Sequence, residues 1–283
     1  MSKKTKVDFT IGADPEFSCE KDGKLVVAEE VITNEPDDGQ FGCDGNGVTF
    51  EIRPSADISP IKLVNNIHKV FVSATMQNPD FLNYKWISRS FHLGYPLGGH
   101  VHFGIHDNQY DHATALLFLD DYVGSISLLL ENKLEGIRRR QDNYGRKSGY
   151  RTQSWGFEYR PMSSWLSSPA VSAGILCLSK MVMYECLNNP RFNFKCYTNE
   201  TDFSNVDHDR LRSIFPKIWA DIVNMELYQT YKPYVDVLYF LVLNKLTWYS
   251  KKDMKETWAL VDFSKSLNKV IANIIWQRFN SEQ

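Results

Sequence analysis

Four short strand-like segments of this 283-residue chain carry paired polar side chains at alternate positions, and this pattern constrains the fold more than any other feature. The segments are IGADPEF, GCDGNGVTFEIRP, GGHVHFG and WGFEYRP. Because side chains two residues apart in a strand point to the same face, each pair lies on one side of a sheet. Carboxylates crowded on one face need a cation between them. The pattern therefore predicts a sheet with a metal-binding face.

The order of the predicted elements indicates a single α+β domain over residues 1–283. Strand patterns and turn signals dominate about residues 7–165, and helical patterns dominate about residues 168–280. Ser59 before Pro60 predicts a capped helix to about Met76, and Asp111 opens a second helix. We expect an antiparallel sheet with helices packed on one face, followed by a helical C-terminal half. The expected strands span residues 7–17, 24–30, 47–54, 84–88, 100–105 and 154–161, and the sequence shows no apolar periodicity from about residue 138 to 151.

Composition narrows the classes of function. A formal net charge of −2 argues against general nucleic-acid binding. The longest apolar run, residues 234–243, contains Asp236 and is too short for a membrane span, so it predicts a buried helix. The N-terminal residues have no apolar segment typical of a secretory signal, which favours the cytoplasm. Five cysteines without a C-x-x-C pair predict free thiols.

Two of the segments concentrate acidic side chains. Asp14 and Glu16 flank Pro15, which cannot donate to a sheet ladder and so predicts a strand end, edge or bulge. A solvated acidic strand end is the alternative for this pair. Asp44 lies in a glycine-rich turn, and Glu51 follows between two apolar residues. Burying Glu51 requires a compensating charge, which is either a cation or a plain salt bridge to the nearby arginine.

The other two segments add nitrogen ligands and positive charge. His100 and His102 share a strand face among glycines that allow close approach to the backbone, although a His-x-His pair alone is often structural. Oxygen ligands outnumber nitrogens in the whole set, which favours Mg²⁺ or Mn²⁺ over Zn²⁺. Arginines from 138 to 160 match phosphate oxygens, and the alternative is a solvated basic loop, which we favour for the three that end a helix, Arg138, Arg139 and Arg140.

The ordered motifs resemble those of the phage-type COOH-NH2 ligases, or amidoligases, of the glutamine synthetase and glutamate-cysteine ligase superfamily. The resemblance covers about residues 10–165. It comprises an acid-x-acid strand, an Asp and then a Glu seven residues later before Arg-Pro, a Gly-Gly-His-x-His strand, a YGR-x-x-x-YR loop and a Glu-x-Arg strand. It implies a curved antiparallel sheet, like the catalytic domain of glutamine synthetase, that binds ATP and two or three Mg²⁺ or Mn²⁺ ions.

The resemblance also implies roles for individual residues. One metal ion would be held by Glu16, Asp44 and Glu51, near the attacking carboxylate. A second, bridging the β- and γ-phosphates of ATP, would be held by Asp14, His100 and Glu158. The residues expected to contact ATP are His102, Arg146, Arg151 and Arg160, of which Arg151 and Arg160 would neutralise the transferred phosphate.

The leading hypothesis is therefore an ATP-dependent ligase that joins a small-molecule carboxylate to an amine through an acyl phosphate, with an amino acid or peptide as one partner. A metal-dependent hydrolase using the histidines and carboxylates is an alternative, but it leaves the arginines around Arg151 unexplained. A noncatalytic nucleotide-binding relative is another. The acidic loop at Asp37 and Asp38 is either an amine-attracting flap or a solvated loop. Neither a membrane nor a nucleic-acid partner is expected, and the cytoplasm would be that of a host if the chain is phage-encoded.

Overall fold

The computed structural model describes residues 6–32, 39–106, 110–189, 192, 195–249 and 252–260. The predicted flap residues Asp37 and Asp38 lie outside these ranges. The strands are β1 (Thr10–Ala13), β2 (Glu16–Lys21), β3 (Lys24–Val26), β4 (Phe41–Cys43), β5 (Phe50–Ile52), β6 (Lys85–Ile87), β7 (Phe91–His92), β8 (Tyr95–Pro96), β9 (Val101–Gly104), β10 (Tyr150–Gln153) and β11 (Gly156–Tyr159). The helices are α1 (Ala28–Val31), α2 (Pro60–Gln77), the 3₁₀ turn η1 (Pro79–Asn83), α3 (His112–Leu119), the π-helical turn η3 (Asp120–Gly124), α4 (Ser125–Leu130), α5 (Lys133–Gln141), α6 (Pro169–Asn188), α7 (Glu200–Asn205), α8 (His208–Val223), α9 (Tyr228–Leu243) and α10 (Met254–Thr257).

The strands form two main antiparallel sheets and a two-stranded hairpin. One sheet has the order β1-β9-β11-β10; the other has the order β3-β2-β5-β4, with β6 also on β2. The sheets meet at Asp14 and Pro15, between β1 and β2, where Pro15 cannot donate to a ladder. Backbone hydrogen bonds cross this junction, from Glu16 N to Gly98 O (2.8 Å) and from Ile52 N to Pro15 O (3.2 Å). The antiparallel arrangement is confirmed, but the strand expected at 7–17 is interrupted.

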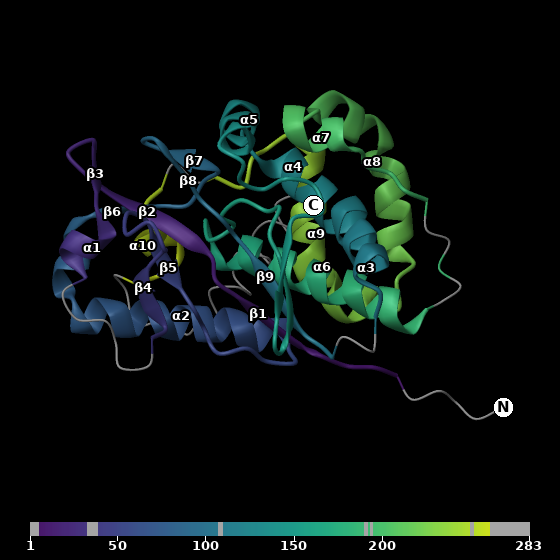
Figure 1. Cartoon of the computed structure of the whole chain (residues 1–283), viewed down its shortest axis with the longest axis horizontal. Helices are drawn as coiled ribbons and strands as arrows, with labels where there is room; N and C mark the ends of the chain where they lie inside the picture. The colour runs from purple at the N-terminus through teal and green to yellow at the C-terminus, as the bar shows by residue number, and fades with distance from the viewer. Residues whose placement is uncertain are drawn as a thin grey trace, which may run out of the picture.

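Helices lie on several sides of the strands, with α2 below and α5 above them, and most of the others gather at one end of the molecule (Figure 1). Below the strands runs α2, which packs against β1 and α6. The helices α3, α4, α6, α8 and α9 gather at one end, and every element described after Pro169 is a helix. The caps of two predicted helices are confirmed, because Ser59 accepts from Lys62 N (3.4 Å) and Asp111 accepts from Thr114 N (2.9 Å).

The local structure differs from the expected strands in two places. Residues 28–31 form helix α1 and do not continue a strand, because Ala28 N and Glu29 N turn to the carbonyls of Val48 and Gly47. Residues 150–153 form β10, which pairs with β11 as a hairpin. Tyr150, Arg151 and Thr152 are largely exposed there, so an edge strand has no apolar alternation to reveal it.

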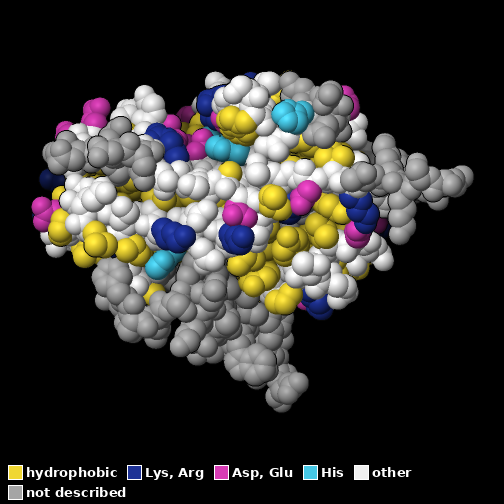
Figure 2. Space-filling view, turned by 90° about the horizontal axis from the view of Figure 1, so that it is seen from below, with side chains coloured by type: hydrophobic (Ala, Val, Ile, Leu, Met, Phe, Trp, Pro, Cys, Tyr) yellow, Lys and Arg dark blue, Asp and Glu magenta, His cyan; other side chains and the backbone are white. Residues whose placement is uncertain are grey.

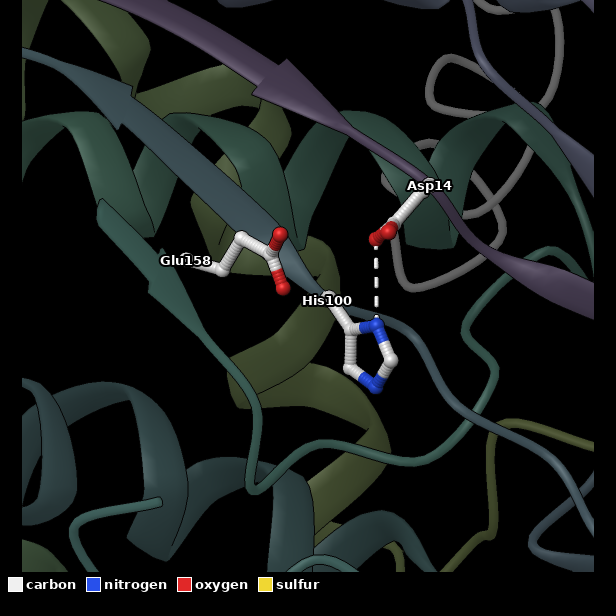
Figure 3. A group of neighbouring side chains, drawn as sticks. All are labelled: Asp14, His100 and Glu158. Atoms are coloured by element: carbon white, nitrogen blue, oxygen red, sulfur yellow. Dashed lines mark hydrogen bonds and ion pairs between the residues drawn. The ribbon is translucent and has the colours of Figure 1, made fainter. Parts of the chain in front are cut away.

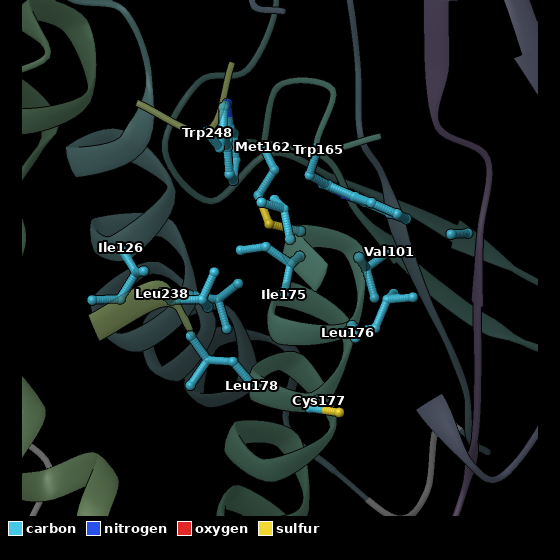
Figure 4. Close-up of a cluster of buried hydrophobic side chains, with 14 of the residues drawn as sticks. Val101, Ile126, Met162, Trp165, Ile175, Leu176, Cys177, Leu178, Leu238 and Trp248 are labelled. Atoms are coloured by element: carbon cyan, nitrogen blue, oxygen red, sulfur yellow. The ribbon is translucent and has the colours of Figure 1, made fainter. Parts of the chain in front are cut away.

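The core is continuous from the helices to the sheets. Side chains from α6, α4 and α9 meet β9 and the segment before α6, with Trp165, Leu176 and Leu238 among them (Figure 4). Two stretches, His112–Leu130 and Pro169–Asn188, are long and apolar enough to span a membrane, but 83% of each is buried inside the protein, which is typical of core helices.

The face below α2 carries charges of both signs. Lysine, arginine and acidic side chains are interspersed with hydrophobic ones over the described part of this face (Figure 2). The distribution accords with the small formal net charge of −2.

Candidate active site

The first cluster comprises Asp14, His100 and Glu158, which come from three neighbouring segments of one sheet (Figure 3). Asp14 follows β1, His100 precedes β9 and Glu158 lies in β11. The register sets Glu158 opposite His102, and His102 opposite Gly12 near the end of β1. One ligand atom from each of the three cluster side chains lies within 4.8 Å of the others. The structure therefore brings together the three residues predicted for one metal ion.

The second cluster comprises Glu16, Asp44 and Glu51, again with one oxygen from each within 4.8 Å of the others. Glu16 and Glu51 are directly opposite in β2 and β5, and Asp44 follows β4. Glu16 and Glu51 are buried. One arginine compensates in part, since Arg53 Nε lies 2.5 Å from Glu51 Oε1. The predicted salt bridge and the predicted carboxylate cluster are therefore both present.

Gly98, one of the two glycines before His100, lies where a larger residue does not fit. Gly98 N donates to Glu16 Oε2 (2.9 Å). A Cβ atom at this position would lie 2.7 Å from His100 Nε2, 2.7 Å from Tyr144 Oη and 2.8 Å from Glu16 Oε1. Glycine is the residue that lets the backbone lie between the two clusters without displacing their side chains.

The negative charge of the first cluster is better compensated by neighbouring side chains than that of the second cluster. Burial opposes ionisation of Asp14, but hydrogen bonds and charge from His100 and His102 bring its pKa below the usual range. Burial and the charge of Asp44 raise the pKa of Glu16 to about 8. Burial and the charge of Asp14 raise the pKa of Glu51 to about 7, despite Arg53. The second cluster therefore has more negative charge than its protein partners neutralise.

The residues predicted to contact ATP differ in their placement. Arg160 Nη1 lies 2.7 Å from Glu158 Oε2, and Arg151 Nη1 lies 3.6 Å from the same oxygen. His102 Nε2 lies 3.0 Å from Asp14 Oδ1. These three side chains border the first cluster. Arg146 is exposed and donates to Asn143 Oδ1, so the structure does not bring it to either cluster.

Tyr144 joins the two clusters, and the motif pattern gave it no role. Its hydroxyl donates to Glu16 Oε1 and lies 3.1 Å from His100 Nε2. Burial and the charge of Glu16 raise the pKa of this phenol, so it stays a donor. The side chain belongs to the YGR-x-x-x-YR loop, in which the arginines carried the prediction. Nothing in the local sequence indicates its contact with Glu16, which lies 128 positions away.

Two of the three arginines that end α5 are buried, which corrects the expectation of a solvated basic surface. Arg139 is fully buried and donates to the carbonyls of Leu97 (3.0 Å), Pro161 (2.7 Å) and Met162 (2.7 Å). Arg140 Nη1 lies 2.8 Å from the buried carboxylate of Glu131. Arg139 thus fixes the segments beside Gly98 and Arg160, because it satisfies three buried acceptors at once. Arg140 also donates to the Gly136 carbonyl (2.9 Å) and so holds α5 to Glu131, which precedes it. Arg138 is the exposed member.

A buried aspartate in the π-helical turn also supports the site. Asp120 accepts from Ser148 Oγ (2.5 Å) and Ser148 N (3.2 Å) in the arginine-rich loop, and from Tyr159 Oη (2.8 Å), next to Glu158. The carboxylate thus anchors both the loop and β11. Turns of this type recur at functional sites.

The donor sets fit divalent cations. Five of the six side chains of the clusters are carboxylates, and hard oxygen ligands suit Mg²⁺ or Mn²⁺. The raised pKa values of Glu16 and Glu51 show that their charge lacks full compensation by the protein. The residues present therefore fit two metal ions, one at each cluster.

The pH dependence of stability tests this imbalance. Because the pKa of Glu51 is raised from 4.5 to about 7, the folded metal-free protein binds a proton that the unfolded chain releases, and stability falls as the pH rises through 7. Glu51→Gln removes this loss. We expect the free energy of unfolding of the variant, relative to wild type, to increase by about 2 kcal/mol from about pH 5.5 to about pH 8.5, measured by urea unfolding with a chelator.

Glu51→Gln is compared with wild type at each pH because buried histidines change the stability of both proteins in the opposite direction. The pKa values of His68, His92, His100 and His208 are lowered, chiefly by burial, so their contribution to stability rises with pH. Glu30→Gln, at an exposed carboxylate of α1, is the control and should track wild type. A constant difference between Glu51→Gln and wild type across the pH range would contradict the prediction.

A comparison with known protein families matches the part of the chain that contains both clusters. The model of one family, described as phage phiEco32-like COOH.NH2 ligase-type 2, matches residues 11–260. The chain belongs to this family. The predicted family is confirmed. A search of curated proteins found no match.

Solved structures share the fold. A bifunctional glutathione synthetase from Pasteurella multocida is similar with a TM-score of 0.50 and 10% sequence identity. The similarity covers 96% of this chain and 52% of the other, so the chain spans about half the length of that protein. At this identity the likeness concerns the fold, a mixture of helices and curled antiparallel sheet.

Proposed function

We propose that this carboxylate-amine ligase uses ATP to convert a carboxylate to an acyl phosphate, which an amine then attacks to form an amide. The observation that carries the proposal is the pair of adjoining three-ligand clusters bridged by Tyr144 and bordered by Arg160 and Arg151. Phosphoryl transfer chiefly requires positioning and charge neutralisation, which such a constellation can supply. We propose further that the sheets form a catalytic domain like that of glutamine synthetase.

The two clusters would have separate roles. Asp14, His100 and Glu158 would hold Mg²⁺ or Mn²⁺ facing the β- and γ-phosphates of ATP. The more acidic cluster, formed by Glu16, Asp44 and Glu51, would hold a second ion facing the substrate carboxylate. Divalent cations there would neutralise the charges of phosphate and carboxylate oxygens that otherwise repel one another. A third ion is compatible with the proposal.

The reaction then proceeds in two displacements. A carboxylate oxygen attacks the γ-phosphorus, the bond to the β-phosphate oxygen breaks, and ADP leaves. The amine nitrogen attacks the acyl carbon, the C–O bond to phosphate breaks, and the nitrogen loses a proton. Arg160 and Arg151 neutralise the phosphoryl oxygens during transfer, and the ion pair of Arg160 with Glu158 orients its guanidinium toward the first cluster. His102 is placed to contact phosphate or substrate.

A groove beside the first cluster suits the adenosine part of ATP. Two cavities, of about 390 and 350 Å³, share Thr10, Gly104 and Trp155, and the first also includes Asp14 and His102. The indole of Trp155 is 42% exposed, and its ring centroid lies 5.1 Å from that of His102. An exposed indole beside the groove is a stacking surface for a base. Phosphates at Asp14 would leave the base near Trp155.

Trp155→Ala is expected to raise the KM for ATP about tenfold with little change in kcat, because base stacking contributes about 1–3 kcal/mol to binding. Steady-state kinetics measures both constants, and Trp155→Phe, which keeps an aromatic ring, should stay close to wild type. If the KM for the carboxylate or amine rises and that for ATP does not, the groove holds the substrate and this assignment is wrong.

An isotope experiment tests the proposed acyl phosphate. A substrate carboxylate labelled with ¹⁸O is expected to pass one labelled oxygen to inorganic phosphate, because the carboxylate oxygen stays on phosphorus when the amine displaces it. Mass spectrometry of the released phosphate measures the transfer. Amide formation with unlabelled phosphate would contradict the acyl phosphate, and phosphate release without amide formation would favour hydrolysis.

The proposal also covers the class of substrate and the cellular compartment. An amino acid or peptide is the partner that we propose, as a small molecule bearing a carboxylate or an amine. We further propose that residues 1–283 act as one catalytic domain in the cytoplasm, which would be a host cytoplasm if the chain is phage-encoded.

A further inference from the structure

The ring of Tyr144 is held in place between the two clusters. Its backbone N donates to the carbonyl of Arg139 (3.2 Å), and the guanidinium carbon of Arg139 lies over the ring, 4.8 Å from its centroid. The guanidinium carbon of Arg160 lies 6.0 Å from the same centroid. Both contacts are within the range in which a cation is attracted to an aromatic face. The ring is therefore fixed, and its hydroxyl contacts one residue of each cluster, Glu16 and His100.

The two hydrogen bonds of this hydroxyl have one possible direction when the second cluster holds a metal ion. Glu16 is then a carboxylate and can only accept, so the single proton of the Tyr144 hydroxyl points to Glu16 Oε1. The Tyr144 oxygen can then only accept from His100 Nε2, which lies 3.1 Å away. A metal ion on Glu16 therefore requires a proton on Nε2 of His100.

The other ring nitrogen of His100 faces the first cluster. Nδ1 lies 3.1 Å from Asp14 Oδ1, and the second nitrogen of the ring points away from Asp14 (Figure 3). A neutral imidazole with its proton on Nε2 presents a lone pair at Nδ1, and a metal ligand must have such a lone pair. A histidine that binds a metal ordinarily donates its other N–H to a neighbouring group, which here is the hydroxyl of Tyr144.

We propose that Tyr144 is a positioning residue that couples the two metal ions, because its hydroxyl directs the Nδ1 lone pair of His100 toward the first ion when Glu16 binds the second. The inference rests on the proposed function, since it requires an ion at each cluster. Either ion favours the same direction of the hydrogen-bond chain from His100 through Tyr144 to Glu16. Each ion therefore increases the affinity of the other cluster through this chain.

Nuclear magnetic resonance of the histidine rings tests the assignment of Nδ1, because the ¹⁵N shift of a ring nitrogen depends on whether it carries a proton. The signals of His100 are those that disappear in His100→Gln. In wild type saturated with Mg²⁺ we expect His100 to carry its proton on Nε2 and to have no proton on Nδ1. A proton on Nδ1 in the Mg²⁺-saturated protein, or His100 signals that do not respond to Mg²⁺, would overturn the proposal.

Tyr144→Phe tests the role of the hydroxyl, because it keeps the ring beside Arg139 and Arg160. Titration of the His100 signals with Mg²⁺ should show about tenfold weaker binding in this variant, as is usual when a metal-bound histidine loses its hydrogen-bond partner. In turnover assays the Mg²⁺ concentration for half-maximal rate should rise about tenfold, with little change in kcat at saturating Mg²⁺. Tyr150→Phe makes the same change at an exposed tyrosine of β10 and should match wild type in both assays.

Glu51→Gln tests the coupling, because it is expected to remove the second ion. Without that ion the direction of the Tyr144 hydroxyl is no longer fixed, so Tyr144→Phe should weaken Mg²⁺ binding at His100 severalfold less in this background than in wild type. Equal weakening in both backgrounds, or normal Mg²⁺ binding in Tyr144→Phe, would overturn the proposal. The titrations need neither ATP nor substrate. Their failure with amide formation intact would therefore refute the role of Tyr144 alone, and a loss of amide formation in wild type would refute the proposed function.

Discussion

Glu51→Gln is expected to reduce ATP-dependent amide formation about 1,000-fold, mainly through kcat, because it removes a buried carboxylate from the more acidic cluster. Glutamine keeps the size of the side chain and leaves Glu16 and Asp44 in place. The loss would therefore come from the missing charge. Steady-state turnover at saturating ATP and Mg²⁺ measures it, and Mn²⁺ titration should show one binding event fewer than in wild type.

Glu30→Gln is the matched control for this variant. It makes the same chemical change at an exposed position on α1 and should keep wild-type turnover. The metal assignment for the second cluster is wrong if Glu51→Gln retains turnover within about twofold of wild type, since loss of a single ligand contact ordinarily costs far more.

Arg160→Ala is the second change with a large expected effect. An arginine that neutralises a transferring phosphoryl group contributes about 10³-fold or more to kcat. Arg160 Nη1 already lies 2.7 Å from Glu158 Oε2, so the substitution also leaves a buried carboxylate with one partner fewer. We expect kcat to fall about 1,000-fold and the KM for ATP to change less. Arg160→Lys should recover part of kcat, because lysine restores the charge without the bidentate geometry.

Arg138→Ala controls for loss of positive charge alone. This arginine is exposed and lies 3.8 Å from Asp142 at the end of α5, away from the clusters. Its removal should leave kcat unchanged. Equal losses in Arg138→Ala and Arg160→Ala would mean that net charge, and not the position of Arg160, determines the rate.

The side-chain sets of the two clusters could be predicted because strand periodicity and the order of motifs both bear on them. A period of two places Glu51 and Arg53 on one face, and the structure pairs them. The resemblance to the ligase family then grouped Asp14 with His100 and Glu158, and the structure brings these side chains together. Their binding of metal remains a prediction.

The features that the sequence did not predict depend on contacts between residues far apart in the chain or on the pairing of strands. Arg139 appeared among consecutive arginines, and its burial follows from carbonyls of Leu97 and Met162 that only the folded chain brings near. Tyr144 meets Glu16 across 128 positions of sequence. β10 is an exposed edge strand whose pairing with β11, and not its own composition, defines it.

The most direct measurement is ADP release with Mg²⁺ against a panel of carboxylates and amines, including amino acids and short peptides, in wild type, Glu51→Gln and Arg160→Ala. The account predicts ADP release that requires a carboxylate and an amine together, yields an amide in equal amount, and is lost in both variants. If ATP binds and no pair in a broad panel promotes release, the chain binds nucleotide without ligating; if amide forms without ATP, the account is contradicted.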